Sequence, residues 1–212
     1  MARPKVDAEA FFRRLAAANP NPRGELEYIN PYTLLVAVVL SAQATDVSVN
    51  KATEPLFKAA DTPQKMLALG EARLKEFIRT IGLYNTKARN VIRLSEILVR
   101  EHGGRVPQDR VALQALPGVG RKTANVVLNV AFDQPTIAVD THIFRLGNRS
   151  GLAPGKTPDA VEQALERRVP AKYKRHAHHW LILHGRYVCK ARKPDCVACV
   201  VRDLCAYRAK TL

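Results

Sequence analysis

Four cysteines lie close together and have the clearest capacity for chemistry in the chain. Six residues separate Cys189 from Cys196, two separate Cys196 from Cys199, and five separate Cys199 from Cys205. Four thiolates at this spacing can surround one metal centre, either a structural zinc ion or a [4Fe–4S] cluster. The spacing is unlike the paired C-x2-C arrangement of most zinc sites and somewhat favours iron–sulfur. Four free thiols would be unusual at this density.

The loop between the first two cysteines is basic, with Lys190, Arg192 and Lys193. A metal centre that holds such a loop rigid would make a surface suited to contacting phosphates. A solvated basic face is the alternative interpretation. The whole chain has the same bias, because its formal net charge is +15 over 212 residues. A polyanionic partner is therefore expected, and nucleic acid is the most common one.

A second chemical feature is the stretch Leu116-Pro117-Gly118-Val119-Gly120. Pro117 and Gly118 break a short apolar turn, and glycine tolerates backbone conformations that other residues resist. The apolar spacing after Gly120 predicts a helix. Helix, hairpin and helix together would direct free backbone N–H groups one way, which makes an anion site suited to a phosphate. Lys122 is the second residue of the expected second helix.

The elements that position these residues all have helical periodicity, and we find no clear strand. We expect an all-α protein of roughly ten helices in two lobes. Asp140 is placed to cap the helix that follows it. The longest apolar run, Leu34 to Leu40, is too short to cross a bilayer. The expected helices cover residues 7–18, 31–42, 45–58, 63–79 (two short helices), 86–101, 121 onward, 141–148, 158–168 and 171–187.

The hairpin, Lys122, Asp140 and the cysteine spacing together resemble the helix-hairpin-helix DNA glycosylases that carry an iron–sulfur cluster, the endonuclease III family. The hairpin alone is a weak signal. Its combination with a lysine two residues after the last glycine, an aspartate and this cysteine pattern is specific. Further stretches that carry the resemblance are Leu40-Ser41-Ala42-Gln43-Ala44-Thr45-Asp46, Ile81-Gly82-Leu83-Tyr84-Asn85, Val139-Asp140-Thr141-His142 and the run from His178 to Arg186.

The resemblance implies a fold and a cofactor. Residues 24–135 would form a six-helix barrel domain with the helix-hairpin-helix motif. Residues 1–23 and 136–212 would form the other lobe, the iron–sulfur cluster domain. The cofactor would be a [4Fe–4S] cluster, with all four cysteines as its ligands. The partner would be double-stranded DNA that contains a damaged pyrimidine or an abasic site.

The resemblance also implies roles for single residues. Lys122 would be the nucleophile of a bifunctional glycosylase and AP lyase that excises oxidised pyrimidines and cleaves the strand by β-elimination. Asp140 would be the second catalytic residue, although an N-cap explains its position equally well. Gln43 and Leu83 match the residues that fill the gap left by a flipped base. The remaining expected DNA contacts are Gly118, Val119, Gly120, Lys190, Arg192 and Lys193.

Two other functions remain open at this point. Adenine-excising relatives share the hairpin, the aspartate and the cysteine spacing, but they lack the lysine and carry a longer C-terminal domain. A non-catalytic hairpin protein that binds DNA or senses redox state is the alternative from a different class. Lys122 and the stretch of only seven residues after Cys205 disfavour the adenine-excising relative. Lys122 and Asp140 together disfavour the non-catalytic protein. Met1 to Glu9 contain no signal-peptide core, so we expect an intracellular protein. With the resemblance, we expect a monomer in the bacterial cytoplasm, associated with the nucleoid and not with a membrane.

Overall fold

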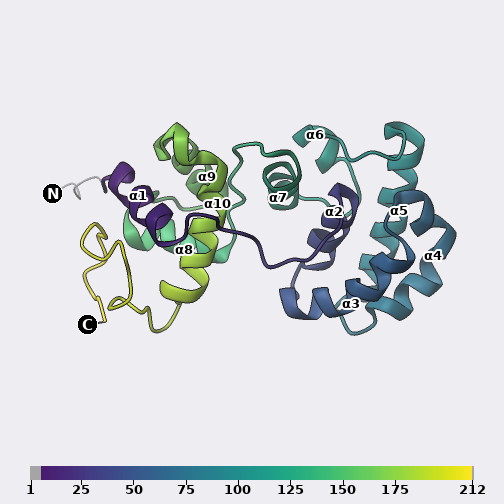
Figure 1. The fold of residues 1–212 in the computed structure, drawn as a ribbon, viewed down its shortest axis with the longest axis horizontal. Coiled ribbons are helices and arrows are strands. Elements are labelled where there is room, and N and C mark those ends of the chain that lie inside the picture. The colour runs from purple at the N-terminus through teal and green to yellow at the C-terminus, as the bar shows by residue number, and fades with distance from the viewer. Residues whose placement is uncertain (1–5, 212) are drawn as a thin grey trace. The chain divides into compact units, whose positions relative to one another are not determined.

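The computed structural model describes residues 6–211, and every regular element in that range is helical (Figure 1). This confirms the all-α prediction. Residues 1–5 and 212, which the predicted cluster lobe includes, lie outside the described range. The elements are α1 (Ala8–Ala18), α2 (Pro31–Leu40), α3 (Asp46–Ala59), α4 (Pro63–Ile78), α5 (Tyr84–His102), α6 (Arg110–Gln114), α7 (Arg121–Phe132), α8 (Thr141–Ser150), α9 (Pro158–Arg168), a 3-10 turn η1 (Ala171–Tyr173), α10 (Lys174–Leu183) and a π-helical turn η2 (His184–Val188).

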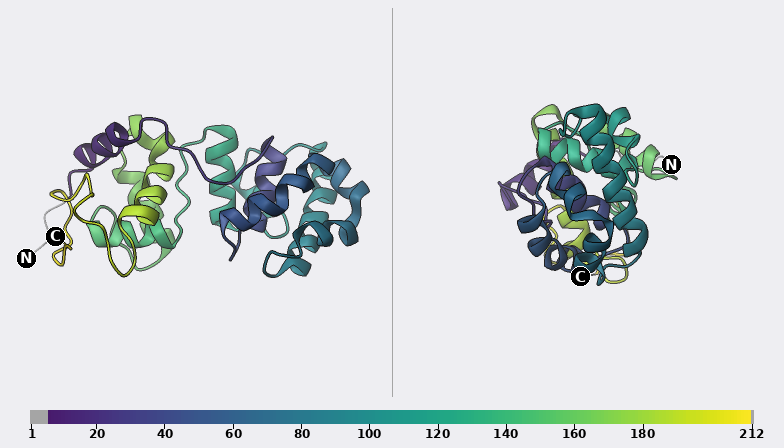
Figure 2. Two further views of the ribbon diagram at one scale, coloured as in Figure 1. Left: turned by 60° about the horizontal axis from the view of Figure 1, so that its bottom comes forward. Right: turned by 90° about the vertical axis from the view of Figure 1, so that its right-hand side faces the viewer.

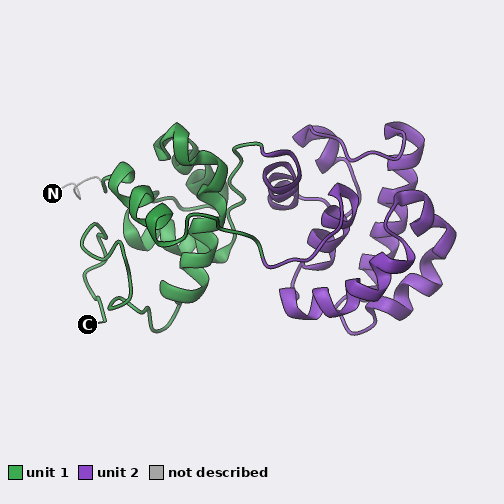
Figure 3. Ribbon diagram, viewed as in Figure 1, with its two compact units in different colours: residues 1–24, 134–212 green, residues 25–133 purple. Residues whose placement is uncertain are grey.

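The described residues form two compact units, which Figure 3 distinguishes by colour. The inserted unit runs from Glu25 to Asp133 and holds the six helices α2 to α7. The terminal unit combines the residues up to Gly24 with those from Gln134 onward. It holds α1, α8, α9, α10, both short turns and the cysteine segment. Each unit has its own hydrophobic core.

Helix α2 is the centre of the inserted unit. Its side chains from Tyr32 to Leu40 are all buried, as an all-round apolar helix requires. The Asn30 side chain accepts from Thr33 N and caps the helix, while Pro31 occupies its first turn. Within the described residues, no helix combines the length and apolarity needed to span a membrane.

Helices α4 and α5 pack along each other within the inserted unit (Figures 1 and 2). The prediction of two short helices over residues 63–79 agrees with a break inside α4, where Gly70 has φ 78° and ψ 161°. Helix α5 begins two residues earlier than expected, because Leu83 adopts a left-handed conformation and turns the chain directly into the helix.

The terminal unit joins the two ends of the chain. Phe12 of α1 packs against Tyr173 and Trp180, and Trp180 Nε1 donates to the carbonyl of Asn19 at 2.8 Å. The single helix expected over 171–187 is divided into η1, α10 and η2. The wider π-helical turn ends with Cys189 N donating to His184 O at 2.7 Å, and it leads the chain into the cysteine segment.

Candidate active site and metal centre

The hairpin between α6 and α7 has the geometry that its sequence predicted. Val119 is buried, and its N–H donates to Leu116 O at 3.1 Å. Gly118 has φ +79°, and a Cβ atom there would come within 2.9 Å of Asn90 Nδ2. The hairpin ends at Gly120, the N-cap of α7, and no side chain caps that helix. The first N–H groups of α7 are therefore available to an anion.

Lys122 lies in the first turn of α7 and is exposed. The opposite face of the same helix is anchored in the core, because Ala124 and Val127 are completely buried. The backbone that carries the Lys122 amine is thus held by packing while the amine itself stays accessible. A nucleophile needs this combination of a fixed base and an open end.

Gln43 and Leu83 share an uncommon backbone conformation. Together with Asp133 they are the non-glycine residues of the described chain with positive φ, at 55° for Gln43 and 62° for Leu83. Both side chains are exposed, and Leu83 is 61% exposed although it is large and apolar. Such conformations cost about 1–3 kcal/mol and concentrate at functional sites. Sequence patterning contained no signal for this feature.

Asp140 caps α8, as its sequence context predicted. Its Oδ1 accepts from Ile143 N at 2.8 Å, and the side chain is half-buried. One turn further on, Arg145 contacts His142 Nδ1 at 3.2 Å and donates to Gly185 O at 2.6 Å. Arg145 also donates to Cys189 O at 3.0 Å. The start of α8 is therefore tied to the backbone that leads into the cysteine segment.

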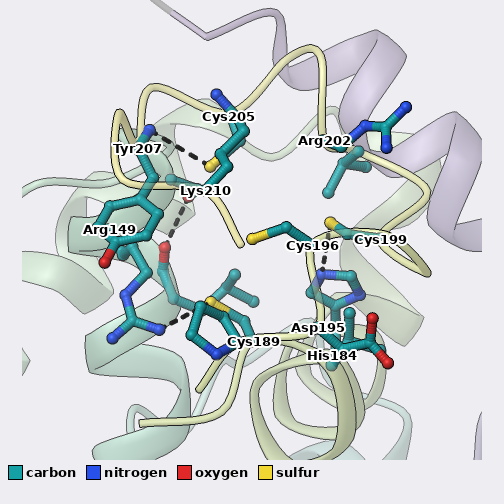
Figure 4. Close-up of a pocket in the computed structure, with 15 residues that line it drawn as sticks. Arg149, His184, Cys189, Asp195, Cys196, Cys199, Arg202, Cys205, Tyr207 and Lys210 are labelled. Carbon is teal, nitrogen blue, oxygen red and sulfur yellow. Dashed lines mark hydrogen bonds between the residues drawn. The ribbon is translucent and has the colours of Figure 1, made fainter. Parts of the chain in front are cut away.

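All four cysteines line one pocket (Figure 4). Among the described residues, no group of three or more His, Cys, Asp or Glu side chains is close enough to hold a single metal ion. A zinc ion would need four sulfur atoms at about 2.3 Å from one centre. A [4Fe–4S] cluster needs four thiolates that are further apart, because each binds a different iron atom. Four cysteine thiols that line one pocket are the donor set that a [4Fe–4S] cluster requires.

Hydrogen-bonding groups contact three of the cysteine sulfur atoms. Arg149 Nη1 lies 3.6 Å from Cys189 Sγ, and Tyr207 N donates to Cys205 Sγ at 3.5 Å. His184 Nε2 is 3.4 Å from Cys199 Sγ. Burial lowers the pKa of His184 to about 4, so that ring is neutral at physiological pH. Contacts of this kind orient metal ligands and tune the centre they hold.

Burial raises the pKa of the Cys199 and Cys205 thiols, and the neighbouring cysteines act in the same direction. Both thiols are therefore protonated in the protein without metal. Metal binding must displace those protons, since only thiolates ligate iron. Four cysteines gathered in one pocket are better explained by a metal centre than by separate free thiols.

The basic loop of Lys190, Arg192 and Lys193 is exposed. Arg149 holds its backbone, donating to Lys190 O at 2.6 Å and to Ala191 O at 2.8 Å. The sequence-based reasoning missed Arg149 and Arg145, the two arginines that support this region. A signal was present, because they lie four residues apart on the helix that Asp140 caps and thus share one helical face.

Comparisons with known proteins agree with these features. Residues 36–171 match the model of the HhH-GPD superfamily of base excision DNA repair proteins, and residues 189–205 match the iron-sulfur binding domain of endonuclease III. Endonuclease III of Escherichia coli (strain K12) is 60% identical over 197 residues, which is 93% of each chain. Endonuclease III of Treponema pallidum (strain Nichols) is 61% identical over 196 residues, covering 92% of this chain and 93% of the relative.

Two solved structures also resemble this fold. A trapped endonuclease III–DNA covalent intermediate, an estranged-adenine complex, superposes with a TM-score of 0.89 at 43% identity and covers 97% of both chains. A thermostable thymine-DNA glycosylase superposes with a TM-score of 0.85 at 26% identity, covering 95% of this chain and 96% of the other.

Proposed function

The chain belongs to the HhH-GPD superfamily of base excision DNA repair proteins and, within it, to the endonuclease III family, and we propose that Lys122 and Asp140 carry out its chemistry. Its activity is that of a DNA glycosylase and AP lyase in base excision repair, and it binds DNA. It holds a [4Fe–4S] cluster. The alternatives of an adenine-excising relative and a non-catalytic hairpin protein are not favoured.

Lys122 is the nucleophile. Its neutral amine attacks C1′ of the damaged nucleotide, forming a C–N bond as the bond between sugar and base breaks, and the base leaves with that electron pair and a proton. The sugar ring then opens, because the lone pair on nitrogen forms the C=N bond as the C1′–O4′ bond breaks and O4′ takes up a proton, and the product is a Schiff base. Loss of a proton from C2′ then expels the 3′ phosphate by β-elimination, and water releases the enzyme. The observation that carries this role is the exposed amine in the first, uncapped turn of α7.

Asp140 acts on the charge that develops in this reaction. A carboxylate near C1′ stabilises the positive charge of the sugar as the base departs, or accepts the proton during elimination. Its capping contact with Ile143 N supports the role, because it fixes the orientation of the carboxyl group. Capping and catalysis therefore both belong to this side chain.

The substrate is an oxidised pyrimidine in duplex DNA, or an abasic site. A base inside a duplex must be rotated out before it reacts, and Gln43 and Leu83 fill the space it leaves. Their positive φ values and exposed side chains support this role. The hairpin residues Gly118, Val119 and Gly120 bind a backbone phosphate. The basic loop of Lys190, Arg192 and Lys193 provides further phosphate contacts.

The four cysteines are the ligands of the cluster. When bound, the cluster would link the segments before and after Cys196 into one rigid surface. We further assign residues 24–135 to the barrel domain and 1–23 with 136–212 to the cluster domain, which the two compact units support. The protein acts as a monomer in the cytoplasm, at the nucleoid.

Borohydride trapping tests the role of Lys122. Wild-type protein incubated with a thymine glycol duplex and borohydride forms a covalent adduct, because reduction fixes the Schiff base. Lys122→Ala forms none, while Lys58→Ala, which changes an exposed lysine on α3, still forms it. A Lys122→Ala protein that still cleaves DNA strands at abasic sites at the wild-type rate would contradict the assignment of Lys122 as the nucleophile.

Two variants separate the roles of Asp140. Asp140→Asn retains a capping oxygen and therefore the folding stability, but it loses the charge, so excision falls by about 10²–10³-fold. Asp140→Ala loses the cap as well and becomes less stable by about 1 kcal/mol. If the Asp140→Asn protein excises the damaged base at the wild-type rate, Asp140 caps α8 and has no catalytic role.

The cysteine assignment is tested by bound iron. Cys199→Ser lowers the iron content and the visible absorbance of the purified protein, whereas Ser150→Ala, at a buried hydroxyl near the same pocket, retains both. A Cys199→Ser protein with a full complement of iron would contradict the proposed ligand set.

A further inference from the structure

One buried amine has no role in the chemistry described above. Lys87 of α5 is only 4% exposed, and its Nζ has no hydrogen-bond partner among the described residues. Burial lowers the pKa of this amine. An amine removed from water without an acceptor is costly, and a protein retains such a group when something else binds it. Lys87 therefore indicates a ligand that supplies oxygen atoms.

The amine lies at the start of a long helix. Lys87 is the fourth residue of the 19-residue helix α5, and its N–H donates to Leu83 O at 3.0 Å. Side chains on a helix point toward its N-terminus and cover the preceding turn. Lys87 follows Leu83 by four residues and therefore lies on the helix face that begins at Leu83, where the first turn of α5 starts.

Those N–H groups have no side-chain cap. Leu83 is the N-cap residue of α5, and an apolar side chain cannot accept a hydrogen bond. Helix α7, which follows the hairpin, is uncapped in the same way. The other α-helices of the described chain that start from a loop are each capped by a side-chain oxygen, from Asp7, Asn30, Thr45, Thr62, Asp109, Asp140 and Thr157.

The start of α5 also contacts the hairpin. Asn90 lies one turn beyond Lys87 and touches Gly118, since a Cβ on Gly118 would meet the Asn90 side chain. Leu83, Lys87 and Asn90 are spaced by four and three residues and so follow one face of the helix. This face runs from the proposed base-replacing residue to the proposed phosphate-binding hairpin, both within the inserted unit.

We propose that the first turn of α5 and the Lys87 amine together bind one backbone phosphate of the DNA, next to the position where Leu83 enters the duplex. The site rests on the proposed function, because it assumes that Leu83 enters DNA. Backbone N–H groups, the positive end of the helix dipole and an ammonium group all favour a phosphate. Since the amine is covered in the free protein, phosphate binding includes a shift of this turn.

The test measures DNA binding as a function of salt concentration. The probe is a duplex with a tetrahydrofuran abasic analogue, which cannot be cleaved, so that catalysis does not affect the result. Lys87→Met replaces the amine with an apolar side chain of similar length. Lys87→Arg retains the charge. Lys58→Met is the matched control, because Lys58 is exposed and pairs with Glu54 on its own helix.

We expect Lys87→Met to bind about tenfold more weakly and the slope of log K against log salt to fall by about 0.9. Lys87→Arg restores most of the slope, and Lys58→Met changes it much less. The melting temperature of Lys87→Met is not lower than that of wild type, because the substitution removes an unpaired buried amine.

Three results would overturn the proposal. The first is an unchanged slope in Lys87→Met, whether or not affinity falls, since weaker binding at constant slope indicates a packing effect. The second is an equal loss of slope in Lys58→Met. The third is a pair of observations: inorganic phosphate raises the melting temperature of wild type but not of Lys87→Met, and the two proteins have equal slopes of log K for DNA against log salt. That pair would indicate a site for free phosphate ions and not for DNA. The catalytic assignment of Lys122 is tested separately by borohydride trapping. If that assignment fails, the difference in slope between Lys87→Met and wild type is still expected.

Discussion

Asn90 of α5 and Gly118 of the hairpin lie in contact, so close that a Cβ atom on Gly118 would come within 2.9 Å of Asn90 Nδ2 and 3.2 Å of Asn90 Cβ. The hairpin is therefore shaped by a helix that precedes it in sequence by nearly thirty residues, as well as by its own glycines. Gly118 is required twice, for its φ of +79° and for its missing side chain.

Gly118→Ala is expected to destabilise the protein by about 1–3 kcal/mol and to weaken binding to an abasic-site duplex. Gly120→Ala is the matched variant for stability, because Gly120 has ordinary φ and a Cβ there would meet no atom within 4 Å. Urea denaturation and fluorescence anisotropy measure the two effects. Equal unfolding free energies for the two variants would show that Asn90 moves aside and that the left-handed turn tolerates alanine.

Leu83 offers a prediction that separates its backbone from its side chain. Leu83→Gly and Leu83→Ala both remove the exposed apolar side chain, so both should excise an oxidised base from duplex DNA more slowly. Only glycine adopts the left-handed conformation without cost, so Leu83→Gly should be more stable than Leu83→Ala by about 1 kcal/mol. Thermal unfolding measures that difference. The reverse order of stability would mean that φ 62° at this position carries no strain.

The exposed basic loop should contribute to the salt dependence of DNA binding. Alanine at Arg192 or Lys193 should weaken duplex affinity and lower the slope of log K against log salt by about 0.9 for each phosphate that the variant no longer neutralises. Arg100→Ala is the control, since Arg100 pairs with the adjacent Glu101 on α5. A slope in Arg192→Ala and Lys193→Ala no lower than in the control would exclude the loop from the interface.

His179 should make stability fall in mild acid. Burial first, and then the charge of His176, holds the pKa of His179 below its ordinary value of 6.5. The unfolded chain therefore binds this proton more readily, and stability is lost as the pH falls below that value, at up to about 1.4 kcal/mol per pH unit.

The variant His179→Gln should lose less unfolding free energy than wild type between about pH 7 and about pH 5. Urea denaturation of both proteins at both pH values gives this double difference, in which acid effects on the rest of the molecule cancel. The same loss in both proteins would show that His179 does not titrate differently on folding.

Local sequence alone predicted most of the helices, because their signals act over one or two turns. Thr157 followed by Pro158, and Asp140 ahead of Thr141, start their helices as expected. The one helix expected over 171–187 was wrong in detail, since the chain widens into a π-helical turn before Cys189. No local pattern encodes that change, which depends on packing of α10 and η2 against α8.

Residue types and their spacing were sufficient to predict the all-α class, the cysteine set, the hairpin and the place of Lys122 after it, because each of these is defined along the chain. Other properties arise only when distant segments pack together. Packing placed Asn90 against Gly118, gave Gln43 and Leu83 left-handed backbones, and left the Lys87 amine buried without an acceptor. Burial and backbone strain depend on which atoms the fold brings into contact, and no pattern within one or two helical turns encodes them.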